Sequence, residues 1–382
     1  MINNRLSKIK EYHFKTLEKI KEEVAYKGYE VIDLGIGDPD LKVHESIIQG
    51  MLEGLKIDGY NNYPPYDGIV SLKKEIIKYY REVFSINLTL DEIIILIGSK
   101  EGISNLIPAI CDIGDYIIIP DPAYPVYESC SYLWGCTPYK VVLEEKNNYQ
   151  MDLSVIPDKI IINSKLMIIN YPNNPTGAIA DEYFYKNTVD YCSQNNIILC
   201  NDGAYNEIIK ENENPISLLQ YGKGKNVIEF GSFSKSFNMT GFRVGFAVGH
   251  REIIRSLLKV KSNVDSSQFK PIQHAAINAL NINREYIKSI RKIYDDRRII
   301  TENILKEKNI QFYNQSRTFY LWCKVPMGYT TEEFCSELLL NNRIMVTPGN
   351  AFGDSGEGYF RISLTKDKDQ IIKYLKSLKV YN

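Results

Sequence analysis

The sequence predicts an α/β protein of two domains, with a mostly parallel seven-stranded sheet in the larger one. A chain of 382 residues is longer than a single hydrophobic core usually supports, which favours two domains. Between about residues 90 and 250, seven short apolar runs recur at intervals that leave room for helices. Several runs are continuous rather than alternating, which is typical of strands buried on both faces of a parallel sheet. They are IIILIGS from Ile93, DYIIIP from Asp115, TPYKVVL from Thr137, LMIINYP from Leu166, IILCND from Ile197, NVIEFGSFS from Asn226 and FRVGFAVG from Phe242.

The pattern changes after the last of these runs. From about Pro271 to Lys308 the residues are highly charged and have helical spacing, and a mixed α/β segment follows. We expect a long helix that leaves the large domain and leads into a smaller α/β domain. The predicted division is an amino-terminal segment (1–40) packing with the small domain, a large cofactor-binding domain (41–275) and a small domain (276–382).

Composition excludes several classes of protein. Forty-six basic and forty-seven acidic residues give a net charge of −1, and no block of like charges suggests a nucleic-acid or polybasic membrane surface. No apolar run reaches eighteen residues, and the charged first residues do not resemble a signal peptide. The seven cysteines form no CxxC motif and the four histidines no metal-binding pair, so we expect reduced thiols, no metal site and a cytoplasmic location.

Three neighbouring strands end in polar or glycine-containing segments. YPNNPTG follows the first, NDGAY the second and GSFSKSF the third. Because ligands of open α/β sheets bind outside the carboxyl ends of the strands, these segments predict one shared crevice.

Lys235 lies between Ser234 and Ser236 in the third segment, and Ser232 precedes them. A lysine between two serines can simply be a solvated loop residue. Here Arg243 follows, and Gly241 would let the backbone approach closely, so the group suggests a phosphate site built around an amine. Such an amine can hold pyridoxal phosphate (PLP) as a Schiff base.

Asp202 ends the strand IILCND, three residues before Tyr205. An aspartate in this position can cap a following helix. A PLP site, however, needs a carboxylate beside the pyridine nitrogen, because protonation of that nitrogen makes the ring an electron sink. We predict this role for Asp202, with Tyr205 bonded to the ring oxygen.

Four further residues are weaker candidates. Asn174 in YPNNPTG could belong to a tight turn, or a cis bond to Pro175 could hold its amide against the ring. Ser99 and Lys100 follow a strand and open a helix, which suits phosphate binding. Tyr124 in DPAYPVY could stack on a planar ring or pack in the core.

Arg361 lies on a predicted strand, in GYFRISL. A strand arginine is often a surface residue, but its planar guanidinium also suits the α-carboxylate of an amino acid.

These motifs give the chain a resemblance over nearly its whole length to the fold-type I, class I/II PLP-dependent aminotransferases. Within that family it is most similar to the LL-diaminopimelate aminotransferase branch, through GSKEGI, SFSKSFNMTGFRVGFAVG, KSNVDSSQF, TFYLWCKVP and TPGNAFGDSGEGYFRISL. The resemblance implies transfer of an amino group between an amino acid and a 2-oxo acid. Diaminopimelate and 2-oxoglutarate would be the substrates, in lysine biosynthesis.

The resemblance also implies residue roles. Lys235 would be the Schiff-base lysine and proton shuttle, Asp202 the partner of the pyridine nitrogen, and Arg361 the carboxylate clamp. Tyr63 would reach the phosphate in a neighbouring subunit, which implies a homodimer with shared active sites. The other implied contacts are Asn174 and Tyr205 to the ring oxygen, Ser99, Lys100, Ser232, Ser234 and Arg243 to the phosphate, Tyr124 to the ring face, and Tyr12, Gly37, Asn174 and Asn263 to the substrate.

One departure affects the expected specificity. Tyr66 occupies the position where plant-like members of the branch carry a glutamate that reads the distal end of the substrate. An alanine- or aspartate-type aminotransferase and a carbon–sulfur lyase on the same scaffold are therefore alternatives. A PLP-binding regulator without turnover is a more remote one, since such proteins normally carry an added DNA-binding module.

Overall fold

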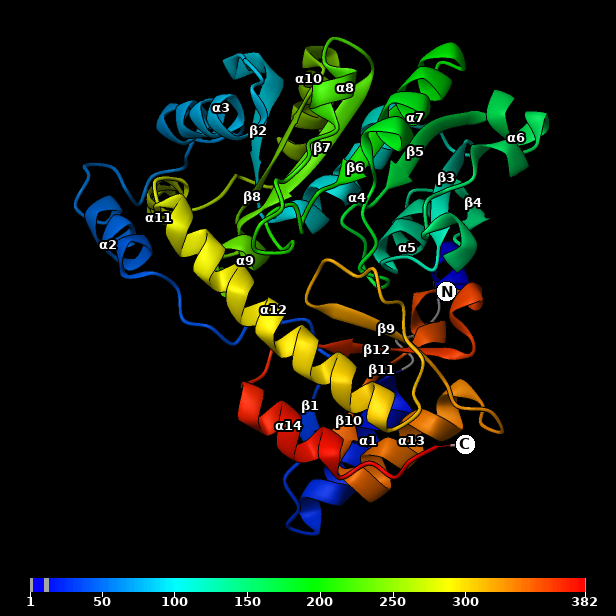
Figure 1. Ribbon diagram of the computed structural model, residues 1–382. Helices are drawn as coiled ribbons and strands as arrows, with labels where there is room; N and C mark the ends of the chain where they lie inside the picture. The colour runs from blue at the N-terminus through cyan, green and yellow to red at the C-terminus, as the bar shows by residue number, and fades with distance from the viewer. Residues whose placement is uncertain (1–2, 10–13, 382) are drawn as a thin grey trace.

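The computed structural model describes residues 3–9 and 14–381, which form a large and a small domain (Figure 1). The large domain, at the top of the view, contains the main sheet with helices on both of its faces. The small domain lies below it. The long helix α12 (Arg284–Glu307) runs diagonally from one domain to the other.

The main sheet has seven strands in the order β2-β8-β7-β6-β5-β3-β4. Only β8 runs against the others, since its pairings with β2 and β7 are antiparallel and the remaining pairings are parallel. All seven apolar runs form strands, and the predicted mostly parallel sheet is confirmed. The strands are β2 (Ile93–Leu96), β3 (Tyr116–Asp121), β4 (Thr137–Val142), β5 (Ser164–Ile169), β6 (Ile198–Asp202), β7 (Val227–Ser232) and β8 (Gly245–Gly249).

Burial on both faces explains the continuous apolar runs. Along β2, Ile93 and Ile95 belong to one core and Ile94 and Leu96 to the core on the opposite face, and all four are fully buried. Helices supply the rest of each core. One core includes residues of α3 (Val70–Phe84), α7 (Glu182–Gln194) and α11 (Lys270–Leu280), and the other includes residues of α4 (Ser99–Ile110), α5 (Val126–Leu133) and α10 (Arg251–Lys261).

The small domain has a core of its own around an antiparallel sheet of order β11-β12-β9. A short parallel pair joins β1 of the amino-terminal segment to β10. Its elements are α1 (Phe14–Tyr26), β1 (Ile32–Asp33), β9 (Tyr320–Lys324), α13 (Thr331–Asn342), β10 (Ile344–Met345), β11 (Thr347–Pro348), β12 (Tyr359–Ser363) and α14 (Lys368–Lys376).

Short helices complete the described chain. The α-helices are α2 (Glu45–Gly54), α6 (Asp158–Ile162), α8 (Leu219–Gly222) and α9 (Phe233–Ser236). The 3-10 helices are η1 (Asn4–Lys8), η2 (Leu90–Glu92), η3 (Glu145–Asn147), η4 (Leu153–Val155), η5 (Thr240–Phe242), η6 (Gly349–Phe352) and η7 (Asp354–Gly356).

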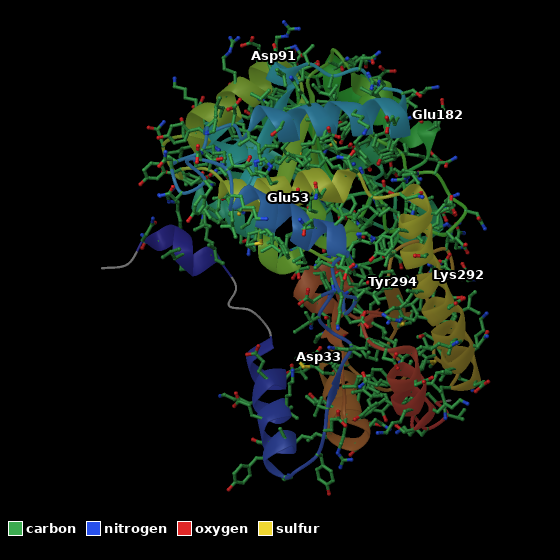
Figure 2. The ribbon with its side chains drawn as sticks, turned by 90° about the vertical axis from the view of Figure 1, so that its left-hand side faces the viewer. Asp33, Glu53, Asp91, Glu182, Lys292 and Tyr294 are labelled. Atoms are coloured by element: carbon green, nitrogen blue, oxygen red, sulfur yellow. The ribbon has the colours of Figure 1, made fainter. Side chains whose placement is uncertain are left out.

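The amino-terminal segment contacts both domains. Figure 2 shows α1 and Asp33 at the small-domain end, whereas η1 lies against the large domain. Arg5 Nη1 of η1 donates to the carbonyl of Leu133 at the end of α5, over 2.9 Å. Within the described residues, η1 therefore packs on the large domain, and α1 and β1 pack on the small domain.

The charged stretch from 271 to 308 forms two helices rather than one. α11 ends at Leu280 and α12 begins at Arg284, where the side chain of Asn283 accepts a hydrogen bond from the backbone of Glu285 and caps the new helix. The predicted boundary at 275/276 falls inside α11, which packs against α2 and α3 of the large domain. The exact division of the chain into domains stays a prediction.

A buried carboxylate ties α12 to the segment that follows β6. Glu207 accepts hydrogen bonds from the Tyr79 hydroxyl at 2.6 Å and from both terminal nitrogens of Arg284, and it pairs with Arg291. Burial alone would raise the pKa of Glu207, but the two guanidinium groups outweigh it and hold the pKa below its usual value. The chain after Asp202 is thus fixed relative to the helix that carries the small domain.

Candidate active site

A pocket of about 480 Å³ opens where the two domains meet at the carboxyl ends of β5, β6 and β7. This is the crevice that the sequence predicted from the three strand-end segments. Both domains contribute to its lining. The predicted residues found there are Gly37, Ser99, Lys100, Tyr124, Asn174, Asp202, Tyr205, Ser232, Ser234, Lys235, Arg243 and Arg361.

Lys235 lies on α9, the short helix that follows β7. Ser232 caps this helix, and the Lys235 amine donates a hydrogen bond of 2.6 Å to the carbonyl of Gly37. Burial lowers the pKa of Lys235 to about 8, with Arg361 and Arg243 adding to the effect and Asp38 opposing it. A large share of this amine is therefore neutral, and nucleophilic, at mildly alkaline pH.

Asp202 ends β6 and is buried. Its Oδ2 accepts a 2.7 Å hydrogen bond from the Tyr127 hydroxyl, whereas Oδ1 is buried without a hydrogen-bond partner. Burial raises the pKa of Asp202 to about 6, although the Tyr127 hydroxyl and the backbone N–H of Ala204 lower it. No helix follows the strand directly, so Asp202 is not a helix cap. Oδ1 is free to accept a bond from a protonated ring nitrogen.

Asn174 and Arg361 connect the large and small domains across the pocket. Arg361 lies on β12, and its Nη1 donates to Asn174 Oδ1 at 2.5 Å while its Nη2 donates to the carbonyl of Gly35 at 2.6 Å. The bond between Asn174 and Pro175 is cis. Since Asn174 Oδ1 accepts from Arg361, its Nδ2 is the group left to donate to a ligand.

The other end of the pocket gathers hydroxyl and cationic groups. Ser99 and Lys100 open helix α4, whose first backbone N–H groups favour an anion, and Arg243 lies beside them. Gly98 has φ of 81°, and a Cβ there would lie 2.6 Å from Arg243 Nη2. This is the close approach that we expected at Gly241, which instead is open to space and has no positive φ.

The pocket therefore contains an amine, a buried carboxylate with one unpaired oxygen, and a group of hydroxyl, cationic and backbone N–H donors that suits a phosphate. Residues 29–378 match the model of the family described as aminotransferase class I and II. The chain belongs to this family. Its members are PLP-dependent enzymes that exchange amino groups between amino acids and 2-oxo acids, and the donors in the pocket fit that cofactor.

Other known proteins are similar over nearly the full length. This aminotransferase is 43% identical to "LL-diaminopimelate aminotransferase" of Aquifex aeolicus, over 99% of this chain and 98% of that protein. It is 44% identical to the protein of the same name from Natranaerobius thermophilus, over 96% of each. The structure of substrate-bound BacF from Bacillus subtilis matches with a TM-score of 0.95 and 30% identity, over 100% of this chain and 99% of that chain.

Two predicted residues of this aminotransferase, Tyr63 and Asn263, do not line the pocket, and the position of a third is not described. Tyr12 lies outside the described residues. Tyr63 is 85% exposed and does not line the pocket. Asn263, just past the end of α10, is also exposed and donates to the carbonyl of Lys259 at 2.8 Å. Within one chain, Tyr63 and Asn263 therefore lie apart from the other site residues.

Several lining residues were not singled out by the sequence analysis, and Tyr127, Tyr320 and Asp38 are the most informative of them. Tyr127 orients Asp202, and it lies one helical turn after Tyr124 in the motif DPAYPVY, a spacing that could have revealed it. Tyr320 opens β9 and its hydroxyl is 3.1 Å from that of Tyr205. Asp38 lies near Lys235 and raises the pKa of its amine.

The described residues contain neither a membrane-spanning helix nor a group of side chains suited to a metal ion. None of the helices formed by residues 3–9 and 14–381 is long and apolar enough to cross a membrane. The same residues contain no cluster of three or more histidine, cysteine, aspartate or glutamate side chains suited to a metal ion.

The lowered pKa of Lys235 predicts its reactivity. In the cofactor-free protein, competitive acetylation of Lys235 should rise with pH around a midpoint near 8, because only the neutral amine reacts. Peptide mass spectrometry measures this midpoint. Asp38→Asn should move the midpoint lower, since the Asp38 carboxylate stabilises the ammonium form. A midpoint at 10.5, the usual pKa of a lysine amine, would contradict the burial of this amine.

Proposed function

We propose that this aminotransferase acts on LL-2,6-diaminopimelate and 2-oxoglutarate, in lysine biosynthesis. The observation that carries the proposal is the identity of 43% and 44% to two proteins named LL-diaminopimelate aminotransferase, over almost the whole chain. The convergence of Lys235, Asp202 and Arg361 on one pocket supports the amino-transfer chemistry itself. A cytoplasmic location stays a prediction.

The polar and charged side chains of the pocket have proposed tasks in binding the cofactor. Asp202 Oδ1 keeps the pyridine nitrogen protonated, and Tyr205 and the Asn174 amide donate to the ring oxygen. Ser99, Lys100, Ser232, Ser234 and Arg243 hold the phosphate. The bound cofactor supplies an electron sink for negative charge at the α-carbon of the substrate.

Lys235 acts twice in this proposal. Its amine would hold the cofactor until a substrate amine takes its place. The freed amine would then be the group in the pocket that accepts the proton from the α-carbon of the substrate and returns it. In the cofactor-free chain burial lowers the pKa of this amine to about 8, which favours its neutral, proton-accepting form at mildly alkaline pH. The first oxo acid leaves before 2-oxoglutarate binds, so ping-pong kinetics are expected.

Arg361 is the proposed clamp for the α-carboxylate. Arg361 is 6% exposed, and the centre of its guanidinium lies 4.0 Å from the centroid of the Tyr320 ring and 4.7 Å from that of Phe352. Aromatic packing on the guanidinium fixes the plane in which its N–H groups can donate. A bidentate carboxylate can therefore bind with little reorganisation.

The amino donor is tested with a panel of substrates against 2-oxoglutarate. We expect LL-diaminopimelate to give a kcat/KM at least tenfold above those of alanine, aspartate and glutamate, and cystathionine to release no pyruvate. Assays of glutamate and pyruvate formation measure this. A preference for alanine or aspartate would reject the diaminopimelate assignment.

The Lys235→Ala variant should fold normally but lose turnover by several orders of magnitude. A variant that transaminates at the normal rate would refute the role of this lysine.

We also propose that two copies form a homodimer with shared active sites. An exposed apolar surface covers helix α2, the segment after it and the segment before α11, on the side of the molecule where Figure 2 labels Glu53. Contacts hold these segments together, since Lys270 donates to the carbonyl of Gly59 at 2.6 Å and the rings of Tyr60 and Phe269 lie 6.4 Å apart. The apolar residues of this surface are Ile48, Leu52, Leu55, Ile57, Tyr60, Tyr63, Tyr66, Val264 and Phe269.

An exposed apolar patch of this kind marks an interaction site, and a two-fold contact would place the same patch against itself. Tyr63 and Asn263 belong to, or border, this surface. In the dimer, Tyr63 of one copy would reach the phosphate end of the pocket in the other. Such a dimer would explain why Tyr63 and Asn263 lie outside the pocket of their own chain.

A complementation experiment tests the shared site. Lys235→Ala and Tyr63→Ala proteins should each be strongly impaired, whereas refolding them together should restore roughly a quarter of the wild-type activity. The reason is that half of the dimers would be mixed, and each mixed dimer would contain one intact site. Refolding each variant alone is the control. Activity of the mixture equal to the mean of the two separate variants would contradict shared sites.

A further inference from the structure

The hydroxyl groups of Tyr205 and Tyr320 meet at the boundary between the domains. Tyr205 comes from the large domain, three residues after β6, and Tyr320 is the first residue of β9 in the small domain. Their oxygens are 3.1 Å apart, and the two side chains are buried, with 7% and 2% exposure. Both line the pocket beside Lys235. This hydrogen bond thus lies within the site but comes from residues of different domains.

Proton counting sets the direction of this bond, if the proposed role of Tyr205 is correct. Each phenol has one hydrogen to donate and an oxygen that accepts. The ring oxygen of the cofactor carries negative charge and can only accept. When Tyr205 donates to that oxygen, its own oxygen must accept, and Tyr320 is the donor in reach.

Several contacts hold the Tyr320 phenol in place. The Arg361 guanidinium lies 4.0 Å from the centroid of the Tyr320 ring, and the backbone of Tyr320 pairs with that of Ser363 in β12. Gly37 passes so close that a Cβ there would lie 1.9 Å from the Tyr320 hydroxyl oxygen. Tyr320 therefore contacts the proposed carboxylate clamp and the glycine whose carbonyl accepts from Lys235.

We propose that Tyr320 is a positioning residue of this aminotransferase. Its hydroxyl donates to Tyr205 and so commits the single proton of Tyr205 to the ring oxygen of the cofactor. A donor that itself accepts a hydrogen bond donates more strongly, because the two bonds polarise each other. Tyr320 thus helps Tyr205 to withdraw charge from the ring oxygen. Arg361 and Asp202 are the charged groups that act most strongly on Tyr205, and Lys235 and Asp38 also line the pocket around the pair.

The test is a pH titration of the absorbance of the cofactor-loaded protein without substrate. Negative charge on the ring oxygen stabilises a proton on the nitrogen that joins Lys235 to the cofactor. Removal of the Tyr320 hydroxyl should weaken donation by Tyr205 and leave more charge on that oxygen. We expect Tyr320→Phe to raise the apparent pKa of this nitrogen by about half a pH unit.

Two controls separate this effect from a structural one. Tyr294→Phe removes a buried hydroxyl that has no hydrogen-bond partner, from a ring 5.1 Å from Phe319, which also contacts Tyr205 and Tyr320. Figure 2 labels Tyr294 on the inner side of α12, across the helix from the exposed Lys292. This variant should titrate like the wild type. In a Tyr205→Phe background, Tyr320→Phe should cause no further shift, since Tyr320 acts through Tyr205.

The outcomes distinguish this inference from the proposed function. If the wild-type protein forms no borohydride-reducible linkage with PLP at Lys235, the proposed function fails. If the linkage forms and Tyr320→Phe titrates at the wild-type pH, only the role of Tyr320 is overturned. Should Tyr320→Phe not fold, 3-fluorotyrosine at position 320 keeps the shape and strengthens the donor. It should lower the apparent pKa, and an unchanged value would overturn the inference.

Discussion

Asp202 ends the central strand β6 with one carboxylate oxygen bonded to Tyr127 and the other buried without a hydrogen-bond partner. Burial of a carboxylate without a cation beside it costs free energy, and here it raises the pKa of Asp202 to about 6. The rest of the site is arranged around this group. The position of Asp202 at the end of β6 places its carboxylate in the pocket, and the phenol of Tyr127 fixes its orientation. A protonated ring nitrogen would offset the free-energy cost of burying this carboxylate.

The pocket depends equally on the junction of the two domains. Asp202, Lys235 and Asn174 come from the large domain, whereas Arg361 and Tyr320 come from strands of the small one. Among the hydrogen bonds that cross the junction, two lie in the pocket itself: one from Arg361 to Asn174 and one between the hydroxyls of Tyr320 and Tyr205. A substrate carboxylate bound at Arg361 would therefore contact the same side chains that adjust the cofactor ring.

The anchoring of α12 serves the same arrangement. Glu207 follows Tyr205 by two residues and is held by Arg284 and Arg291 of α12. Because α12 carries the small domain, this ion-pair network sets the position of Arg361 relative to the loop after β6. The buried network thus links the fold of the small domain to the geometry of the pocket.

Much of the fold could be predicted from local pattern. The seven apolar runs predicted strands because burial on both faces requires continuous apolar residues. Lys235 and Asp202 could be predicted as site residues because they lie at, or just after, the carboxyl ends of such strands. Contacts between distant segments could not be predicted in this way. Tyr127 meets Asp202 across 75 residues and Tyr205 meets Tyr320 across 115, and no local periodicity encodes such pairs. The prediction of one long helix overlooked Asn283, a typical N-cap residue that directly precedes the charged residues of α12.

The most direct test of the central role of Asp202 is the unfolding free energy of Asp202→Asn with and without PLP. At pH 8 the cofactor-free variant should be more stable than the wild type by about 2 kcal/mol, because a buried charge is removed while the bond to Tyr127 can remain. The native pKa of Asp202 is raised from 3.8 to about 6, so this gain should disappear as the pH falls from 7 to 4. PLP should stabilise the variant much less than the wild type. A cofactor-free variant that is less stable than the wild type, and that PLP stabilises equally, would contradict the account.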